Sequence, residues 1–248
     1  MISQYIALDT ETTGLNPVKD RVLEIGAARV CDGKVYETFD TLIDTGVEIP
    51  ERIVELTGIT DEMQNTGKKP QQAFSEFLEF CGDLPILGHH ISFDFGFLKQ
   101  GAVNLGFTFE KEGLDTLVLA RQFLPDLPSR KLPDLCVHYG IDPGHSHRAL
   151  DDALATHELL WKLWEEFGER KPEAFVTRKL QYSVKKQSPM TDSQKGYLND
   201  LLKYHRIDTN IRMETMTKSE ASRMIDKIIL QYGKIPGRRK MQEDRKHV

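Results

Sequence analysis

The sequence predicts an α/β domain followed by a small helical unit. Strand-like apolar segments come first, helix-like apolar periodicity dominates from residue 70 onward, and two capping boxes lie near the C-terminus. The strands are expected at 2–9, 20–30 and 34–43. Between the last two lies Asp32-Gly33, a strong hairpin signal, so the sheet is expected to open with antiparallel strands.

Further elements follow in order along the chain. Helices are expected at 50–58, 70–81, 92–105, 132–139 and 148–168, a short strand at 84–88, and a strand end followed by a helix at 113–123. Ser92 is read as the N-cap of one helix and Asp115 as the cap of another. The stretch between Gly58 and Lys69 reads as a polar loop. His157 neighbours apolar residues on its helix and is expected to be a core residue.

The C-terminal quarter has its own organisation. Domain boundaries are predicted as 1–170 for the main domain, 171–190 for a linker that is partly helical near 172–182, and 191–233 for a small helical domain. A basic tail at 234–248 is expected to be disordered. Thr191 to Gln194 and Thr217 to Glu220 both fit the capping box, so helices are expected at 192–205 and 218–232.

Charge and cysteine usage limit the possible partners and the compartment. The net charge is −5, but residues 186–248 hold 14 Lys+Arg against 8 Asp+Glu, whereas residues 1–185 hold 19 against 30. A basic appendage on an acidic body is weak evidence for a nucleic-acid partner. No apolar run approaches the roughly 18 residues of a membrane span. The three cysteines form no C-x-x-C pair, so a cytoplasmic protein without a membrane partner is expected.

Two carboxylates stand at the end of the first strand. Side chains alternate across a strand, so Asp9 and Glu11 project to one face, roughly 7 Å apart. Like charges placed side by side are costly unless a cation joins them, and carboxylate oxygens suit Mg²⁺ or Mn²⁺. A strand running into a polar loop is the simpler alternative for this pair taken alone.

Two later helices each begin with an acid that shares a face with apolar residues. Asp94 heads a column with Leu98, Ala102 and Leu105, although a first-turn Asp can also simply complement the helix dipole. Asp152 shares its face with Leu159 and Leu163 and turns inward, whereas Asp151 lies on a solvent stripe. His147 is expected on the preceding loop, pointing back over the same pocket.

This set of residues resembles the DEDDh exonucleases, a family typified by the proofreading epsilon subunit of bacterial DNA polymerase III. The resemblance covers about residues 1–168. Its motifs are D-x-E-T-T-G-L at 9–15, G-H-x-x-x-F-D-x-x-F-L at 88–98 and H-x-x-x-x-D at 147–152, with 21–27 similar to the family's second strand. The sequence departs from the family at His90, where an asparagine is frequent.

The resemblance implies an RNase H-like fold and two divalent ions, Mg²⁺ or Mn²⁺, held by Asp9, Glu11, Asp94 and Asp152. It implies that His147 acts as general base in a two-metal hydrolysis of phosphodiester bonds from a 3′ end, releasing nucleoside 5′-monophosphates. It also implies substrate contacts, with Leu15 and Phe93 packing on unstacked bases. The implied contact residues are Thr12, Thr13, Gly14, Leu15, His89, His90 and Phe93.

Three functions remain open from the sequence. The first is a 3′→5′ exonuclease acting on single-stranded DNA or DNA 3′ ends in proofreading or repair, with a DNA polymerase or another replication or repair protein as partner. The second is an exoribonuclease that trims RNA 3′ ends, because the sequence does not determine how the pocket meets a 2′-hydroxyl. The third is a non-catalytic module that binds nucleic acid or a polymerase.

Overall fold

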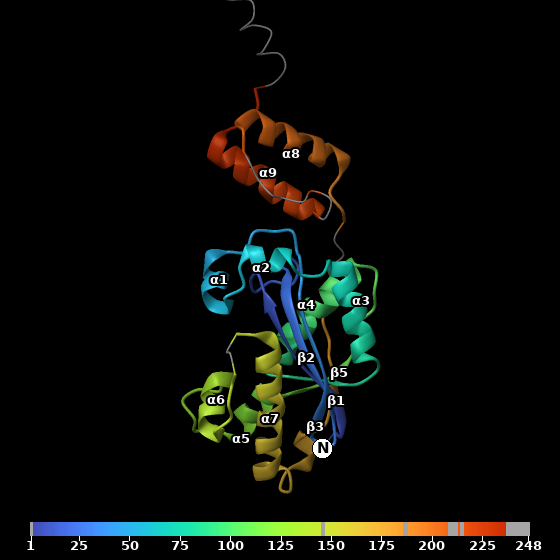
Figure 1. Cartoon of the computed structure of the whole chain (residues 1–248), viewed down its shortest axis with the longest axis vertical. Helices are drawn as coiled ribbons and strands as arrows, with labels where there is room; N and C mark the ends of the chain where they lie inside the picture. The colour runs from blue at the N-terminus through green and yellow to red at the C-terminus, as the bar shows by residue number, and fades with distance from the viewer. Residues whose placement is uncertain (1, 145–146, 186–187, 208–212, 214–215, 237–248) are drawn as a thin grey trace, which may run out of the picture. The chain divides into compact units, whose positions relative to one another are not determined.

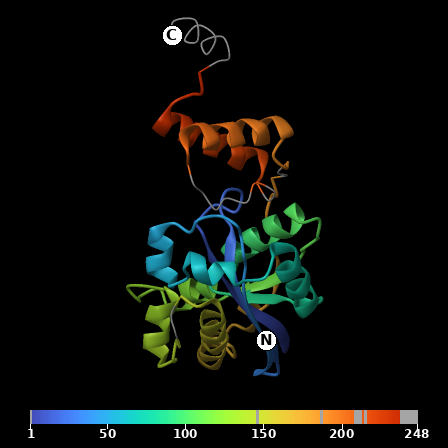
Figure 2. The same cartoon turned by 45° about the horizontal axis from the view of Figure 1, so that its top comes forward.

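The computed structural model describes residues 2–144, 147–185, 188–207, 213 and 216–236. The chain divides into two compact units, residues 1–185 and 186–248, which are described separately below. Figure 1 labels their helices and strands, and Figure 2 gives a second view of the same elements. Within the described ranges, no helix has both the length and the apolar character needed to cross a membrane.

The first unit opens with three antiparallel strands, β1 (Gln4–Thr12), β2 (Val22–Cys31) and β3 (Lys34–Leu42). The predicted hairpin joins β2 to β3, and both of its turn residues have positive φ, 47° at Asp32 and 76° at Gly33. Such values suit a two-residue turn and explain why Asp-Gly occupies it. β1 extends past its predicted end, so Asp9 and Glu11 lie within the strand.

Three shorter strands complete a mixed sheet in the order β3-β2-β1-β4-β5-β6. β4 (Ile86–Gly88) runs parallel to β1, β5 (Glu112–Asp115) runs parallel to β4, and β6 (Arg178–Lys179) is antiparallel to β5. The predicted fold class, a mixed sheet with an antiparallel opening and flanking helices, is confirmed. The segment predicted as a linker contributes β6 to the sheet edge and also holds a short 3₁₀ helix, η1 (Pro172–Ala174).

Helices cover both faces of this sheet (Figure 1). On one face, α3 (Pro70–Cys81) and α4 (Ile91–Asn104) pack against Ile6 and Leu8 of β1. On the other face, α5 (Thr116–Phe123), α6 (Leu132–Tyr139) and α7 (Ala149–Phe167) pack against Tyr5 and Ala7. The alternation of side chains along β1 therefore divides the core into two layers. Asp9 and Glu11 belong to the alternate set with Ala7, the set that faces α7.

Two local predictions were wrong. The stretch after α1 (Glu51–Thr57) is not all loop, because α2 (Asp61–Asn65) forms there with Thr60 as its N-cap, accepting from the Met63 amide at 3.3 Å. Ser92 is not the N-cap of α4. His90 holds that position in a left-handed conformation, φ 73°, and the helix begins one residue later. Asp115 does cap α5, accepting from the Leu117 amide at 2.9 Å.

The second unit consists of α8 (Asp192–His205) and α9 (Lys218–Tyr232), with the predicted bounds and both predicted capping boxes. Figures 1 and 2 both show the two helices side by side. Their shared core is small, built on Leu198, Leu201 and Ile228 with Met216 from the segment before α9. Of the predicted disordered tail, residues 237–248 lie outside the described residues.

Candidate active site

The first two acids of the site come from the middle of the sheet. Asp9 pairs with Gly26 of β2, and Glu11 pairs with Glu24. Both side chains are half-buried. β2 pairs with β1 at both positions, and β4 pairs with β1 just before them, at Ile6 and Ala7, so the strand that carries the two carboxylates is anchored in the sheet.

The third acid comes from the first turn of α4. Asp94 is 3% exposed and accepts two hydrogen bonds from Thr10, one from the backbone amide at 3.0 Å and one from Oγ1 at 2.7 Å. Thr10 lies between Asp9 and Glu11 in β1, so these bonds tie the start of α4 directly to the strand that carries the other two acids. The Asp94 carboxylate is therefore oriented by β1 itself.

The fourth acid and the histidine come from the start of α7. His147 has a left-handed backbone, φ 65°, and its amide donates to Oδ2 of Asp152 at 3.2 Å. One ligand atom each from Glu11, His147 and Asp152 lie within 4.8 Å of one another. The structure thus brings His147 back over the acids, as predicted. Exposure does not separate Asp151 from Asp152, since both are half-buried; what separates them is that Asp152 joins this cluster.

Electrostatics show how tightly the acids are gathered. Burial raises the pKa of Asp9 well above its ordinary range, and the charges of Asp94, Asp152, Glu11 and Glu24 raise it further. The pKa of Glu11 rises to about 8, first through burial and then through Asp152. Burial raises the pKa of Asp94 to about 7, against the opposing effect of the Thr10 hydrogen bonds. The pKa of Asp152 is raised by burial as well.

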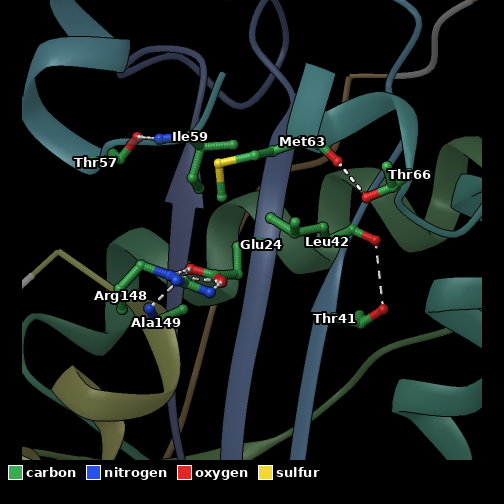
Figure 3. A network of polar contacts seen from close by, with 9 residues as sticks. All are labelled: Glu24, Thr41, Leu42, Thr57, Ile59, Met63, Thr66, Arg148 and Ala149. Carbon is green, nitrogen blue, oxygen red and sulfur yellow. Dashed lines mark hydrogen bonds and ion pairs between the residues drawn. The ribbon is translucent and has the colours of Figure 1, made fainter. Parts of the chain in front are cut away.

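An ion pair joins Arg148 to the buried Glu24 carboxylate at the start of α7 (Figure 3). The Glu24 side chain is fully buried and accepts from Nε of Arg148 at 3.0 Å and from Nη2 at 2.6 Å. It also accepts from the Ala149 amide, at 3.0 Å, so it satisfies a free N–H at the start of α7. Arg148 directly follows His147, so the pair holds the histidine turn against β2.

Gly26 allows the same helix to approach β2 closely. A Cβ at this position would lie 2.0 Å from the Leu150 nitrogen and 2.1 Å from the Ala149 carbonyl carbon. Only hydrogen fits there. Because Gly26 is the register partner of Asp9, the backbone of α7 meets the sheet beside the first acid.

Glu24, Gly26 and Arg148 were not predicted as site residues. The stretch from Arg21 to Ala27 was noted only for its resemblance to a family strand. A charged residue inside the apolar run Val22-Leu23-Glu24-Ile25 was the available signal, because a buried carboxylate requires a partner. The sequence does not say which of its basic residues supplies that partner.

The end of β1 and the loop that follows it hold the next four predicted site residues. Thr12 and Thr13 are buried; Oγ1 of Thr12 donates to the Gly14 carbonyl at 2.6 Å, and the Thr13 amide donates to the Arg21 carbonyl at 2.9 Å. The Thr13 amide is therefore already engaged in the fold. A Cβ on Gly14 would meet the Asp20 carboxylate at 2.5 Å. Leu15, by contrast, is 79% exposed.

The remaining three lie around the start of α4: His89 and His90 precede the helix, and Phe93 is in its first turn. His89 bonds Oγ1 of Thr116 at 2.9 Å through Nδ1 and the Arg130 carbonyl at 2.8 Å through Nε2, so its predicted role in substrate binding would require one of these bonds to break. Burial lowers the pKa of His89. The exposed His90 ring stacks near Phe93, with 6.2 Å between centroids. His90 and Phe93 thus form an accessible aromatic pair at the start of α4.

The cluster suits divalent cations. The charges of Glu11, Asp94 and Asp152 raise the pKa of Asp9, and those of Asp152 and Asp94 raise the pKa of Glu11, so a bound cation would stabilise both ionised carboxylates. Two ligand atoms at about 2.1 Å from one Mg²⁺ lie up to about 4.2 Å apart, close to the separation within Glu11, His147 and Asp152. Assisting the hydrolysis of a phosphodiester bond is one reaction that metal ions bound by such a cluster could support.

The family model described as Exonuclease (RNase_T) matches residues 6–160, which contain most of β1 and most of α7, and so all five predicted catalytic residues. The chain therefore belongs to this exonuclease family. This confirms the family resemblance seen in the motifs.

The chain is also similar in sequence to individual relatives and in fold to solved structures. The chain is 40% identical over 157 residues to the PolC-type DNA polymerase III of Clostridium perfringens, covering 63% of this chain and 11% of that polymerase. The chain therefore spans about a tenth of the length of this curated relative. It shares its fold with an E. coli ExoI–ssDNA complex (TM-score 0.61, 21% identity, 70% of this chain and 42% of that one). It shares it also with a 3′-exonuclease that recognises a histone mRNA stem-loop (TM-score 0.56, 15% identity, 66% and 82%).

Proposed function

We propose that the protein is a 3′→5′ exonuclease that removes nucleotides from the 3′ end of single-stranded DNA and releases nucleoside 5′-monophosphates. The observation that carries this proposal is the convergence of Asp9, Glu11, Asp94, Asp152 and His147 from β1, α4 and the start of α7. A Thr10 hydrogen bond orients Asp94, and the His147 amide bonds Asp152 beside Glu11. The family match spans all five residues.

Asp9, Glu11, Asp94 and Asp152 would hold two divalent cations, Mg²⁺ or Mn²⁺. When bound, such ions favour ionisation of a water molecule and stabilise the charge on the attacking and leaving oxygens. His147 lies beside Glu11 and Asp152, where its imidazole would act as the general base that accepts a proton from water. The left-handed turn and the Glu24–Arg148 pair hold that ring in place, so little reorganisation is required when substrate enters.

Leu15 and the His90–Phe93 pair would receive the terminal bases. Leu15 is largely in solvent, and the two rings lie at the start of α4, beside Asp94 in the chain. Contacts with base faces tolerate any sequence, as an enzyme that removes successive nucleotides requires.

DNA is favoured over RNA as the substrate by the relative with the higher identity, a DNA polymerase. The fold alone supports either, because one structural neighbour is bound to single-stranded DNA and another recognises an mRNA stem-loop. A role in proofreading or repair, a polymerase partner and a cytoplasmic location belong to the same proposal.

A digestion series from the 3′ end tests this function. Purified protein is given 5′-labelled single-stranded DNA, duplex DNA with a mispaired 3′ end, and RNA of matched sequence, each with Mg²⁺, Mn²⁺ or EDTA. We expect stepwise shortening of single-stranded DNA that EDTA abolishes, and mononucleotides carrying a 5′-phosphate. Full activity after chelation would contradict the metal-assisted mechanism, and faster digestion of RNA would reassign the substrate.

Neighbouring positions supply the matched variants. Asp9→Ala is expected to lower the rate by about a thousandfold or more, because it removes a central metal ligand. Asp151→Ala removes the same group one residue from Asp152 and is expected to change the rate less than about twofold. If the native protein shortened none of the substrates with either metal, the chain would be a non-catalytic module. Full activity in Asp9→Ala would show that the hydrolysis does not depend on this cluster.

A further inference from the structure

The helices of the second unit run in the same direction. Near their starts, Nε2 of Gln194 donates to the Lys218 carbonyl at 3.0 Å and to Oγ of Ser222 at 2.9 Å. At their ends, Nε2 of His205 bonds the Gly233 carbonyl at 3.0 Å. A hairpin of two helices would be antiparallel, but here both N-termini lie together and both C-termini lie together. Figures 1 and 2 show the pair side by side.

This parallel arrangement collects aromatic side chains at the C-terminal ends. The ring of His205 lies between two tyrosines, 4.9 Å from Tyr204 and 5.6 Å from Tyr232, measured between centroids. The tyrosines are 49% and 48% exposed. Three rings from two helices therefore lie against one another through His205, and both tyrosines remain open to solvent.

Positive charge collects at the same end. Lys203 and Arg206 flank the α8 rings, Lys234 follows Tyr232, and all three are exposed. Residues 201–207 and 230–236 contain no Asp or Glu. Cations in a last turn stabilise a helix dipole, which accounts for part of this charge. The dipole does not account for the exposed rings, which carry no charge.

We propose that this aromatic-basic end (Lys203, Tyr204, His205, Arg206, Tyr232 and Lys234) binds single-stranded nucleic acid. Exposed rings offer stacking surfaces for unpaired bases, and the cations pair with phosphates, a combination that binds single strands without regard to sequence. That this nucleic acid is the substrate of the enzyme itself rests on the proposed function. The aromatic-basic end would then hold the polymer outside the active site.

The role of the rings is tested by binding of the full-length chain to an oligothymidylate. A length of about 30 nucleotides exceeds the number of nucleotides that one single-strand-binding domain usually covers. Fluorescence anisotropy is measured in EDTA so that no cleavage is required. We expect the double variant Tyr204→Ala/Tyr232→Ala to raise Kd about tenfold, and the double phenylalanine variant to bind like the native protein. Tyr36→Ala, which removes an exposed tyrosine from β3, is the control and is expected to leave Kd unchanged.

Salt dependence tests the charges. We expect Lys203→Gln/Arg206→Gln to reduce the slope of log K against log salt by about 1.4, the value for two contacts to a single strand. Lys195→Gln, in the first turn of α8, is the matched control and is expected to keep the native slope. Circular dichroism confirms that each variant retains its helices.

The proposal is overturned if the tyrosine variant keeps the native Kd and the charge variant keeps the native salt slope while both remain folded. In that case this surface would bind a protein partner instead. An equal loss of affinity in Tyr36→Ala would also overturn it. Failure of the exonuclease function is recognised separately: it would appear as the absence of metal-dependent shortening, while the effect of the tyrosine pair on binding in EDTA would persist.

Discussion

Glu11 shows how the site is balanced at the scale of single residues. It lies in β1 beside Asp9, close to Asp152 and His147, and its pKa is raised to about 8 by burial and by neighbouring acids. Such an arrangement stabilises a bound cation and destabilises the metal-free protein. The Thr10 hydrogen bonds reduce this cost at Asp94, and the His147 amide reduces it at Asp152.

Stability should therefore depend on pH in the absence of metal. The folded protein keeps a proton on Glu11 up to about pH 8, whereas the unfolded chain releases it near 4.5. The contribution of this group to folding is fully present below the lower value and is lost as pH rises through the higher one. In EDTA we expect Tm to fall as pH rises from about 5 to 8, less steeply in Glu11→Gln.

Added Mg²⁺ or Mn²⁺ should restore Tm at the alkaline end of this range in the native protein, because the cation binds the ionised carboxylates. Thermal melts with and without the metal provide the comparison. A Tm that is independent of pH in EDTA, or identical slopes for native protein and Glu11→Gln, would mean that Glu11 is not crowded by other acids in solution.

At the scale of elements, the approach of α7 to β2 completes the site. Gly26 permits close backbone contact, and the pair of Glu24 and Arg148 fixes the turn before the helix. His147 and Asp152 reach the acids of β1 because these contacts position the start of α7.

Gly26→Ala should therefore be strongly destabilising. Its Cβ would overlap the backbone of Ala149 and Leu150, which cannot rotate away, so we expect a loss of about 3 kcal/mol in the free energy of unfolding and a lower exonuclease rate. Gly196→Ala makes the same change in α8, where nothing lies within 4 Å, and should instead stabilise the second unit by about 0.5–1 kcal/mol. Denaturant unfolding of both variants checks the contrast.

Arg148→Met should separate stability from activity. It leaves the buried Glu24 carboxylate without its ionic partner, so we expect the free energy of unfolding to fall by about 2 kcal/mol. This loss is smaller than for a fully buried pair because 38% of the Arg148 side chain is exposed. Adding Glu24→Gln removes the unpaired charge and should recover part of the stability. Neither variant should recover kcat, because the His147 turn stays released. Full activity in Arg148→Met would show that the pair does not position the histidine.

At the scale of the whole molecule, an acidic unit carries the site and a basic unit follows it. Both would serve one polyanionic substrate if metal ions neutralise the acids of the first unit and the cations of the second meet phosphates directly. The family match ends at residue 160, so the second unit adds something outside the family's shared domain.

Removal of residues 186–248 should leave turnover of short oligonucleotides unchanged, because every residue of the proposed site lies before that segment. It should weaken binding to long strands, chiefly at low salt, where phosphate contacts contribute most. Initial rates on short DNA and Kd values for long DNA across a salt series check both expectations. Equal salt dependence with and without the segment would exclude the second unit from substrate binding.

Much of the architecture followed from local patterns. The bounds of α3, α6, α8 and α9 matched because apolar periodicity and caps are encoded within each segment. Prediction failed where a long-range contact overrode a local preference. Ser92 is a good N-cap residue, but the His90 amide bonds Asp115 on a neighbouring strand at 3.0 Å, and the turn adopts a left-handed conformation. Likewise, β6 has two residues and exists only because β5 offers an edge.

By itself, the sequence determined the α/β class, the helices of the second unit, and the identity of the acids and the histidine, because spacing within a strand or helix places side chains on a known face. Only the tertiary structure decided that Glu24 would pair with Arg148, that Gly26 would let α7 meet β2, and that α8 and α9 would run parallel. These features join residues far apart in the chain. Which of many such pairings forms depends on the packing of the whole domain, and local patterns do not record it.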